Sequence, residues 1–215
     1  MLEKIKEEIC KGNKMLATNG LVKWTSGNLS ARDNETNLVV IKPSGIMFED
    51  LTPEIMCVVD LNGNLVEGKL KPSTDTKSHL YVYRNSKEIN SVVHTHSPFA
   101  TSFAICGEPL KVYTTTAAGV FGDDIPISDF VTIGDEEIGK EIINKATKVG
   151  AILIKNHGVF TVGSNYLQAL KKAVVLEENA EYVYYALLRK NNLTPLKKEI
   201  VDYHYNDYHT IYGQK

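Results

Sequence analysis

Apolar residues recur at helical spacing in two long stretches of the chain. Near the start they fall on one face and predict an amphipathic helix over residues 2–18, which Asn19 and Gly20 end. A second helix is predicted from Ser164, as its cap, to about Lys190. Its inward-facing positions are expected to be Leu167, Leu170, Val174, Val183 and Leu187. Residues 135–148 also have a helical period.

Short apolar runs between turn residues predict strands. Asn62-Gly63 separates two such runs, which is the strongest short-range signal for a hairpin. The predicted strands are 28–32, 37–41, 58–61, 65–68, 89–96, 151–154 and 160–163. Two further helix starts are predicted, at Thr52-Pro53 and at Ser73 or Thr74, the latter helix running through Tyr83. Hairpins interspersed with helices indicate an α/β chain, with one sheet between helices.

Composition limits the class of protein. The 215 residues, 43% of them hydrophobic and 23% charged, suit one globular domain over residues 1–215. A net charge of -2 argues against a nucleic-acid partner. Because the start of the chain is charged and no apolar run approaches the length of a membrane span, we expect a cytoplasmic protein with no membrane partner. Cys10, Cys57 and Cys106 are expected to be reduced core thiols.

Three histidines form the first candidate site. His94 and His96 are two residues apart at the end of an apolar strand, so their imidazoles point to the same side of the sheet. His157 follows a second buried strand. Three imidazoles with an open fourth position are typical of catalytic zinc. The alternative is that they are ordinary histidines at strand ends. Because the His-x-His pair and the third histidine occur together, we place the metal site first.

Two similar segments, residues 42–45 and 71–74, form the second candidate site. Each has a Lys-Pro-Ser sequence that offers a cation, a hydroxyl and turn N–H groups, which together can bind phosphate. Asp75 follows the second segment as a candidate metal ligand or general base. Gly27 allows a close backbone approach to a ligand and Asn28 can donate to phosphate or hydroxyl. Plain turns, and an acidic residue in a helix's first turn, are the alternatives for these residues.

Taken in order, these segments resemble the class II aldolase/adducin-like family over nearly the whole chain. The matching segments are residues 26–30, 42–45, 71–76, 94–97 and 156–158. Within the family, Asp75 and the tail from Asp202 to Gln214 are most similar to the L-ribulose-5-phosphate 4-epimerase branch. The resemblance implies a single-domain α/β/α sandwich with a central, mainly antiparallel sheet, assembled as a homotetramer.

The resemblance also implies roles for residues of this chain. His94, His96 and His157 would bind Zn²⁺ or another divalent metal, with Asp75 beside or on it. The residues implied to hold the phosphate and hydroxyls of a phosphorylated ketose are Gly27, Asn28, Lys42, Ser44, Gly45, Ser73 and Thr74. Tyr212, in a tail over residues 200–215, would donate a proton in the neighbouring subunit's site. His79 is expected to give structural support.

One departure bears on the reaction. Gly119 stands where the epimerase branch has an Asp as its second acid/base, with Asp123 and Asp124 a few residues later. Epimerisation by C–C cleavage and re-addition needs two such groups, whereas an aldolase releases the aldehyde. The sequence thus favours an epimerase-like enzyme, with an L-fuculose-1-phosphate aldolase type as the alternative. A decarboxylase or dehydratase stays open, and a non-catalytic scaffold like the adducin head ranks last because all three histidines are present.

Overall fold

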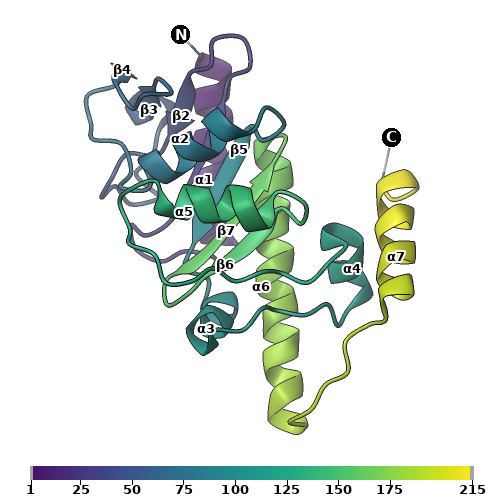
Figure 1. Cartoon of the computed structure of the whole chain (residues 1–215). Coiled ribbons are helices and arrows are strands. Elements are labelled where there is room, and N and C mark those ends of the chain that lie inside the picture. Colours follow the sequence, from purple (N-terminus) through teal and green to yellow (C-terminus); the bar gives the residue numbers. More distant parts are fainter. Residues whose placement is uncertain (1, 214–215) are drawn as a thin grey trace.

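The computed structural model describes residues 2–213, so that Gln214 and Lys215 of the predicted tail lie outside the described part. Seven strands form one sheet in the order β4-β3-β2-β1-β5-β7-β6, and the neighbouring strands are antiparallel (Figure 1). The strands are β1 Asn28–Arg32, β2 Val39–Ile41, β3 Cys57–Val59, β4 Leu65–Glu67, β5 Ser91–Thr95, β6 Ala151–Ile154 and β7 Gly158–Gly163. The predicted hairpin around Asn62-Gly63 joins β3 to β4.

Helices cover both faces of this sheet and confirm the α/β/α sandwich. They are α1 Glu3–Thr18, α2 Thr76–Asn85, α3 Pro98–Cys106, α4 Thr115–Phe121, α5 Glu137–Glu141 with a π-helical continuation Ile142–Ala146, α6 Tyr166–Arg189 and α7 Lys198–Thr210. Val93 packs in the core beneath α1 and α6, whereas its neighbour Val92 packs beneath α2 and α5. Successive side chains of β5 thus serve opposite layers, as strand geometry requires.

The chemistry-bearing segments meet at one edge of the sheet. Asn28, the first residue of β1, pairs with His94 near the end of the antiparallel strand β5. The turn from β6 to β7, which holds His157, and the segment after β2, which holds Lys42, lie at this same edge because those strands are antiparallel to their neighbours. Antiparallel pairing therefore gathers residues that are up to about 130 positions apart in the chain.

A third core lies at the β6 and β7 end of the sheet, where α3, α4, α6 and α7 pack around Phe121 and Leu176. Figure 1 shows α7 standing beside α4, away from the sheet. The sequence did not predict α3, α4 or the helical character of α7. Helices α3 and α4 are short, and the apolar positions of α7 are largely aromatic residues within a polar run, so that periodicity gives a weak signal.

Several local predictions were wrong. Asp75 and Asn165 are the residues at the caps of α2 and α6, in place of Ser73 or Thr74 and Ser164, and the Asn165 side chain accepts from the N–H of Gln168. The helix predicted from Pro53 is a single 3₁₀ turn, Pro53–Ile55. Leu167 is 53% exposed because it lies on the outer side of α6, and Cys106 is an exposed thiol at the end of α3.

Among the described residues, no helix combines the length and apolar character that a membrane span requires. Cys10 and Cys57 are buried free thiols, as expected.

Candidate functional site

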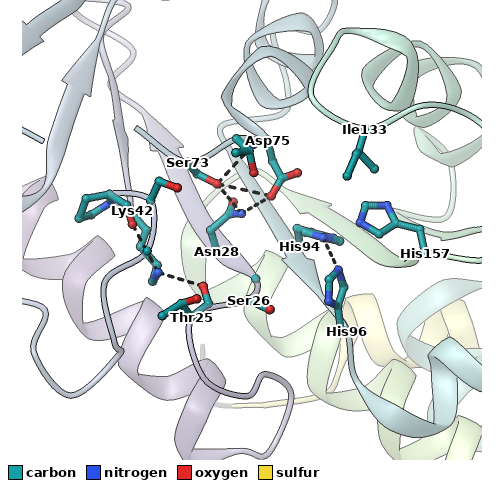
Figure 2. A pocket seen from close by; sticks show the side chains of 15 residues that line it. Thr25, Ser26, Asn28, Lys42, Ser73, Asp75, His94, His96, Ile133 and His157 are labelled. Atoms are coloured by element: carbon teal, nitrogen blue, oxygen red, sulfur yellow. Dashed lines mark hydrogen bonds between the residues drawn. The ribbon is translucent and has the colours of Figure 1, made fainter. Parts of the chain in front are cut away.

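A polar cavity of about 270 Å³ opens at the edge of the sheet where these segments meet (Figure 2). It is lined by Thr25, Ser26, Gly27, Asn28, Lys42, Pro43, Ser44, Gly45, Ser73, Thr74, Asp75, His94, His96, Ile133 and His157. Every predicted site residue except Tyr212 is in this set. The lining residues that were not predicted as site residues are Thr25, Ser26, Pro43 and Ile133. The first three lie within or next to the predicted segments, whereas Ile133 comes from an exposed loop that carries no sequence signal for a site.

The three predicted histidines converge at one side of the cavity. Their ligand nitrogens all lie within 4.8 Å of one another. The Nε2 atoms of His94 and His96 are 3.0 Å apart, and the His157 ring centroid lies 4.7 Å from that of His94 and 5.0 Å from that of His96. Three nitrogen donors at this separation can bind one divalent cation and leave a position open to a substrate.

Hydrogen bonding and burial prepare these imidazoles to be ligands. The Nδ1–H of His94 donates to the carbonyl oxygen of Val159 at 3.0 Å, so its Nε2 lone pair faces His96. Burial lowers the pKa of His94 to about 3 and also lowers the pKa values of His96 and His157. The rings are therefore uncharged at neutral pH, as metal ligation requires. His157 Nδ1 is buried and has no hydrogen-bond partner among the described residues. This donor set fits a divalent metal.

Gly158 allows the three rings to come together. A β-carbon at this position would lie 2.5 Å from the carbonyl oxygen of Thr95 and 2.8 Å from Cδ2 of His96. It would also lie 3.4 Å from Cε1 of His94. The residue after His157 must therefore be a glycine for β7 to approach β5 this closely.

The two Lys-Pro-Ser segments lie side by side and pair with each other. The N–H of Ser44 donates to the carbonyl oxygen of Lys71 at 2.9 Å, and the N–H of Ser73 donates to that of Lys42 at 3.0 Å. Pro43 and Pro72 form an antiparallel bridge between them. The segments thus build one wall of the cavity together. The two serine N–H groups are engaged in this pairing, and the Ser73 hydroxyl also bonds to Asn28 and Asp75. Among the serine and threonine hydroxyls of these segments, those of Ser44 and Thr74 are therefore the ones available to bind an anion there.

Lys42 brings a buried cation to that wall. Its side chain is 2% exposed, and Nζ donates to the carbonyl oxygen of Thr25 at 3.2 Å and lies 4.8 Å from the centroid of the Phe48 ring. Burial lowers the pKa of Lys42 to about 8. No carboxylate neutralises it in these contacts, so an anionic ligand would gain from its charge.

Asn28 and Asp75 lie between the anion wall and the histidines (Figure 2). The Asn28 amide Nδ2 donates to Asp75 Oδ2 at 2.7 Å and to Ser73 Oγ at 3.0 Å, and its Oδ1 is buried without a partner among the described residues. Burial alone would raise the pKa of Asp75, but His94, His79 and the Asn28 amide favour its charged form and hold the pKa below its usual value. Asp75 is thus an anion turned toward Asn28, next to the imidazoles.

His79 supports this arrangement from inside the protein, as expected. It is fully buried, and its Nδ1 lies 2.7 Å from Ser30 Oγ, which is 2.6 Å from the hydroxyl of Tyr83. Burial lowers the pKa of His79 to about 4. The ring therefore packs as a neutral group behind Asp75.

Neither Tyr212 nor Gly119 lines the cavity of its own chain. The Tyr212 ring stacks on Tyr208 with centroids 4.7 Å apart, and it does not line the cavity. Gly119 is buried in α4, where a β-carbon would lie 3.1–3.2 Å from Cβ, Cγ and Cδ2 of Tyr208. The Tyr208 ring thus fills the space that a side chain at residue 119 would need.

The acids after Gly119 have structural contacts. Asp124 Oδ1 accepts from the N–H of Val112 at 2.9 Å. Asp123 accepts from the Asp124 N–H and forms an ion pair with Lys148 at 3.0 Å. Neither acid lines the cavity of its own chain. Both belong to a polar turn of their own chain.

The chain is similar to known proteins over nearly its whole length. Residues 7–184 match the family model "Class II Aldolase and Adducin N-terminal domain". An L-ribulose-5-phosphate 4-epimerase UlaF from Salmonella paratyphi A is 37% identical over 100% of both chains, and one from Salmonella typhi matches equally well. A solved L-fuculose 1-phosphate aldolase is 30% identical, with a TM-score of 0.88 and 96% of each chain covered. An L-fuculose-1-phosphate aldolase from Thermus thermophilus is 25% identical, with a TM-score of 0.77 over 90% of this chain and 99% of its own.

Proposed function

Because this chain belongs to the class II aldolase and adducin family, we propose that it is a metal-dependent enzyme that 4-epimerises L-ribulose 5-phosphate by cleaving and re-forming a C–C bond. The observation that carries the proposal is a single cavity with three converging imidazoles on one side and an anion-binding wall on the other. Full-length similarity to the Salmonella epimerases supports the choice of substrate.

His94, His96 and His157 are the residues that would hold the metal, for which we propose Zn²⁺. A bound divalent cation supplies Lewis acidity toward the oxygens of a ketose, which stabilises negative charge during C–C cleavage. Asp75 is near enough to these imidazoles to influence their charge, and it would join the metal or accept a substrate hydroxyl. The presence of all three histidines supports an enzyme over an adducin-like scaffold.

The opposite wall would hold the phosphate. Lys42 offers its positive charge, and Ser44 and Thr74 offer hydroxyl donors. Ser73 would join them by exchanging its 3.4 Å bond to Asp75 Oδ2 for one to the phosphate. The positive φ of Gly27 and Gly45, +88° and +71°, lets the backbone turn without side chains at the cavity. Binding the phosphate at this wall would direct the carbonyl end of the sugar toward the histidines. The free Oδ1 of Asn28 lies between them as an acceptor for a substrate hydroxyl.

The proposed donor of a proton to the reacting oxygen is Tyr212, which lies outside the cavity of its own chain. For Tyr212 to protonate the reacting oxygen it must reach the cavity of a neighbouring subunit, since it does not line its own. We therefore propose a homotetramer in which the tail, residues 200–213 of the described part, completes the adjacent site. A cytoplasmic location suits a sugar-phosphate enzyme with free thiols.

Aldol cleavage without re-addition is the second candidate, and a specific observation favours it. Gly119 offers no acid, Tyr208 fills the space around it, and Asp123 and Asp124 are engaged in a turn. With one proton-transfer group in place of two, the aldehyde would be released after cleavage. The solved L-fuculose 1-phosphate aldolase with a TM-score of 0.88 is consistent with this alternative.

A product analysis tests the proposal and separates the two candidates. Purified protein loaded with Zn²⁺ is incubated with L-ribulose 5-phosphate, and the products are followed by chromatography. D-xylulose 5-phosphate is the expected product, whereas glycolaldehyde phosphate and dihydroxyacetone would identify an aldolase. His96→Ala is the matched control, and it should give neither. If the metal-loaded wild type left the substrate unchanged, the proposed substrate would be wrong, and L-fuculose 1-phosphate would be the next compound to test.

A further inference from the structure

Helix α3 joins the backbone segments of two of the three histidines. Its first residue, Pro98, comes two positions after His96. Near its other end, the carbonyl oxygen of Ala104 accepts the N–H of Asn156, the residue before His157, at 3.2 Å. A shift of α3 would therefore displace both His96 and His157. His94 is held separately, because it lies inside β5 and its Nδ1 bonds to Val159.

The N-terminus of α3 is held by a residue from another helix. Glu177 of α6 accepts the N–H of Phe99 on Oε1 and the N–H of Ala100 on Oε2, both at 2.8 Å. Ser97, at the cap position, makes no side-chain cap hydrogen bond, and Pro98 has no N–H. The carboxylate thus takes the place of a local cap, and its charge also complements the positive end of the helix.

The segment of α6 that carries Glu177 is anchored in the core. Its neighbours on α6, Leu176 and Ala180, are fully buried, and α6 packs against β5 and β7. The carboxylate therefore connects α3 to the helix that rests on the same two strands as the histidines. His96 itself is exposed and follows the last residue of β5, so its position depends on the backbone that leads into α3.

We propose that Glu177 is a positioning residue for the metal centre: by fixing α3 against α6, it holds His96 and His157 in reach of His94. The inference rests on the proposed function, because it assumes that the three histidines bind a cation. A cap that served stability alone would lower the unfolding midpoint and leave the metal affinity of the folded protein unchanged. Metal affinity is therefore the measurement that separates the two roles.

The experiment measures Zn²⁺ affinity of the full chain by competition with a chromophoric chelator, for wild type, Glu177→Ala, Glu177→Gln and Glu178→Ala. Glu178 is the matched control, since it is adjacent, exposed and bonded only to Tyr182 among the described residues. Loss of a group that orients a metal ligand weakens metal binding by about 10–100-fold, which is the result expected for Glu177→Ala. Glu177→Gln keeps one acceptor, so its Zn²⁺ affinity should lie between those of wild type and Glu177→Ala. The Zn²⁺ affinity of Glu178→Ala should match that of wild type.

The visible spectrum of bound Co²⁺ provides a second readout, because it reports the geometry of the ligands. It should change in Glu177→Ala and not in Glu178→Ala. A folded Glu177→Ala with wild-type affinity and an unchanged spectrum would overturn the proposal. If that variant does not fold, Glu177→Gln decides in the same way. A wild type that binds neither metal would instead refute the proposed metal centre, and the positioning role with it.

Discussion

Gly158 stands so close to His96 that a β-carbon on it would lie 2.8 Å from Cδ2 of the imidazole. The carbonyl oxygen of Thr95, at 2.5 Å from that β-carbon, closes the other side. Neither neighbour is the far end of a flexible chain, so any side chain at residue 158 must push β7 away from β5 or turn the His96 ring. The metal centre thus depends on a residue that is not itself a ligand.

We therefore expect Gly158→Ala to weaken Zn²⁺ binding at least tenfold, with a loss of stability of about 1–3 kcal/mol from overpacking. Chelator competition and urea unfolding measure the two effects. Gly139→Ala is the control, because its β-carbon would meet the carbonyl oxygen of Ser78 at 2.6 Å, in a crowded place that is not part of the cavity. It should lower stability and leave metal affinity unchanged. Equal metal affinity in Gly158→Ala and wild type would contradict the prediction.

Restoring an acid at residue 119 should conflict with Tyr208. Because a β-carbon there would lie 3.1 Å from Cβ of Tyr208, we expect Gly119→Asp to cost about 1–3 kcal/mol of unfolding free energy. When Tyr208 is replaced by Ala, Gly119→Asp should lower the free energy of unfolding by less than it does in the wild-type background. A double-mutant cycle in urea measures this coupling. Strictly additive effects would show that Tyr208 does not limit the side chain at position 119.

Tyr212→Phe should lower turnover far more than it raises the Michaelis constant, because a proton donor acts in the transition state. Tyr203→Phe, a change at another exposed tyrosine of the same tail, should have little effect. If only the Michaelis constant changed, Tyr212 would be a binding residue.

Co-expression tests the neighbouring-subunit contribution of Tyr212 directly. His96→Ala chains, which should be inactive, and Tyr212→Phe chains, whose turnover should be low, should together gain activity. In a randomly mixed ring, about a quarter of the sites combine an intact histidine set with an intact tyrosine. Mixed tetramers that stay inactive would show that both residues act within one chain.

The pH dependence of catalysis should report Lys42. Burial lowers its pKa to about 8, so the free enzyme loses this positive charge as the pH rises past that value. Since a phosphate anion needs the cation, kcat/KM should fall by about tenfold per pH unit above pH 8. Lys42→Arg keeps its charge throughout this range and should remove that limb of the profile. If kcat/KM of the variant still fell above pH 8, the titration of another group would cause that fall.

The pH dependence of stability should report His79. Its pKa is about 4 in the folded chain and about 6.5 when unfolded, so protonation favours the unfolded state. The stability it provides is complete above pH 6.5 and is lost as the pH falls toward 4, by about 2 kcal/mol at pH 5. Urea unfolding of the metal-free protein at pH 7.5 and pH 5 gives a total loss to which His94, with its pKa of about 3, also contributes, so the His79 share is the difference between wild type and His79→Gln. In His79→Gln, the difference in unfolding free energy between pH 7.5 and pH 5 should be smaller than in wild type by about 2 kcal/mol. An equal difference in the two proteins would contradict the role given to His79.

Sequence reasoning could predict much of the sheet and most of the cavity. Period-2 runs, the Asn62-Gly63 turn and the helical periods of α1 and α6 are local signals, since they depend only on neighbours in the chain. The pair His94 and His96 is local in the same sense, because strand geometry alone puts both imidazoles on one side. The other predicted cavity residues were candidates from their side-chain chemistry, and the resemblance of their motifs to those of a family favoured that interpretation over plain turns.

The tertiary structure alone decided how these parts meet. That Gly158 must have no side chain, that Glu177 caps α3 and that Tyr208 fills the place beside Gly119 are contacts between residues 62 to 89 positions apart. No local preference encodes such contacts. They follow from the antiparallel register of β5 and β7 and from the packing of α6 and α7, which are fixed only when the whole chain buries its apolar surface. Local pattern determined which residues could act, and long-range packing determined which of them share a site.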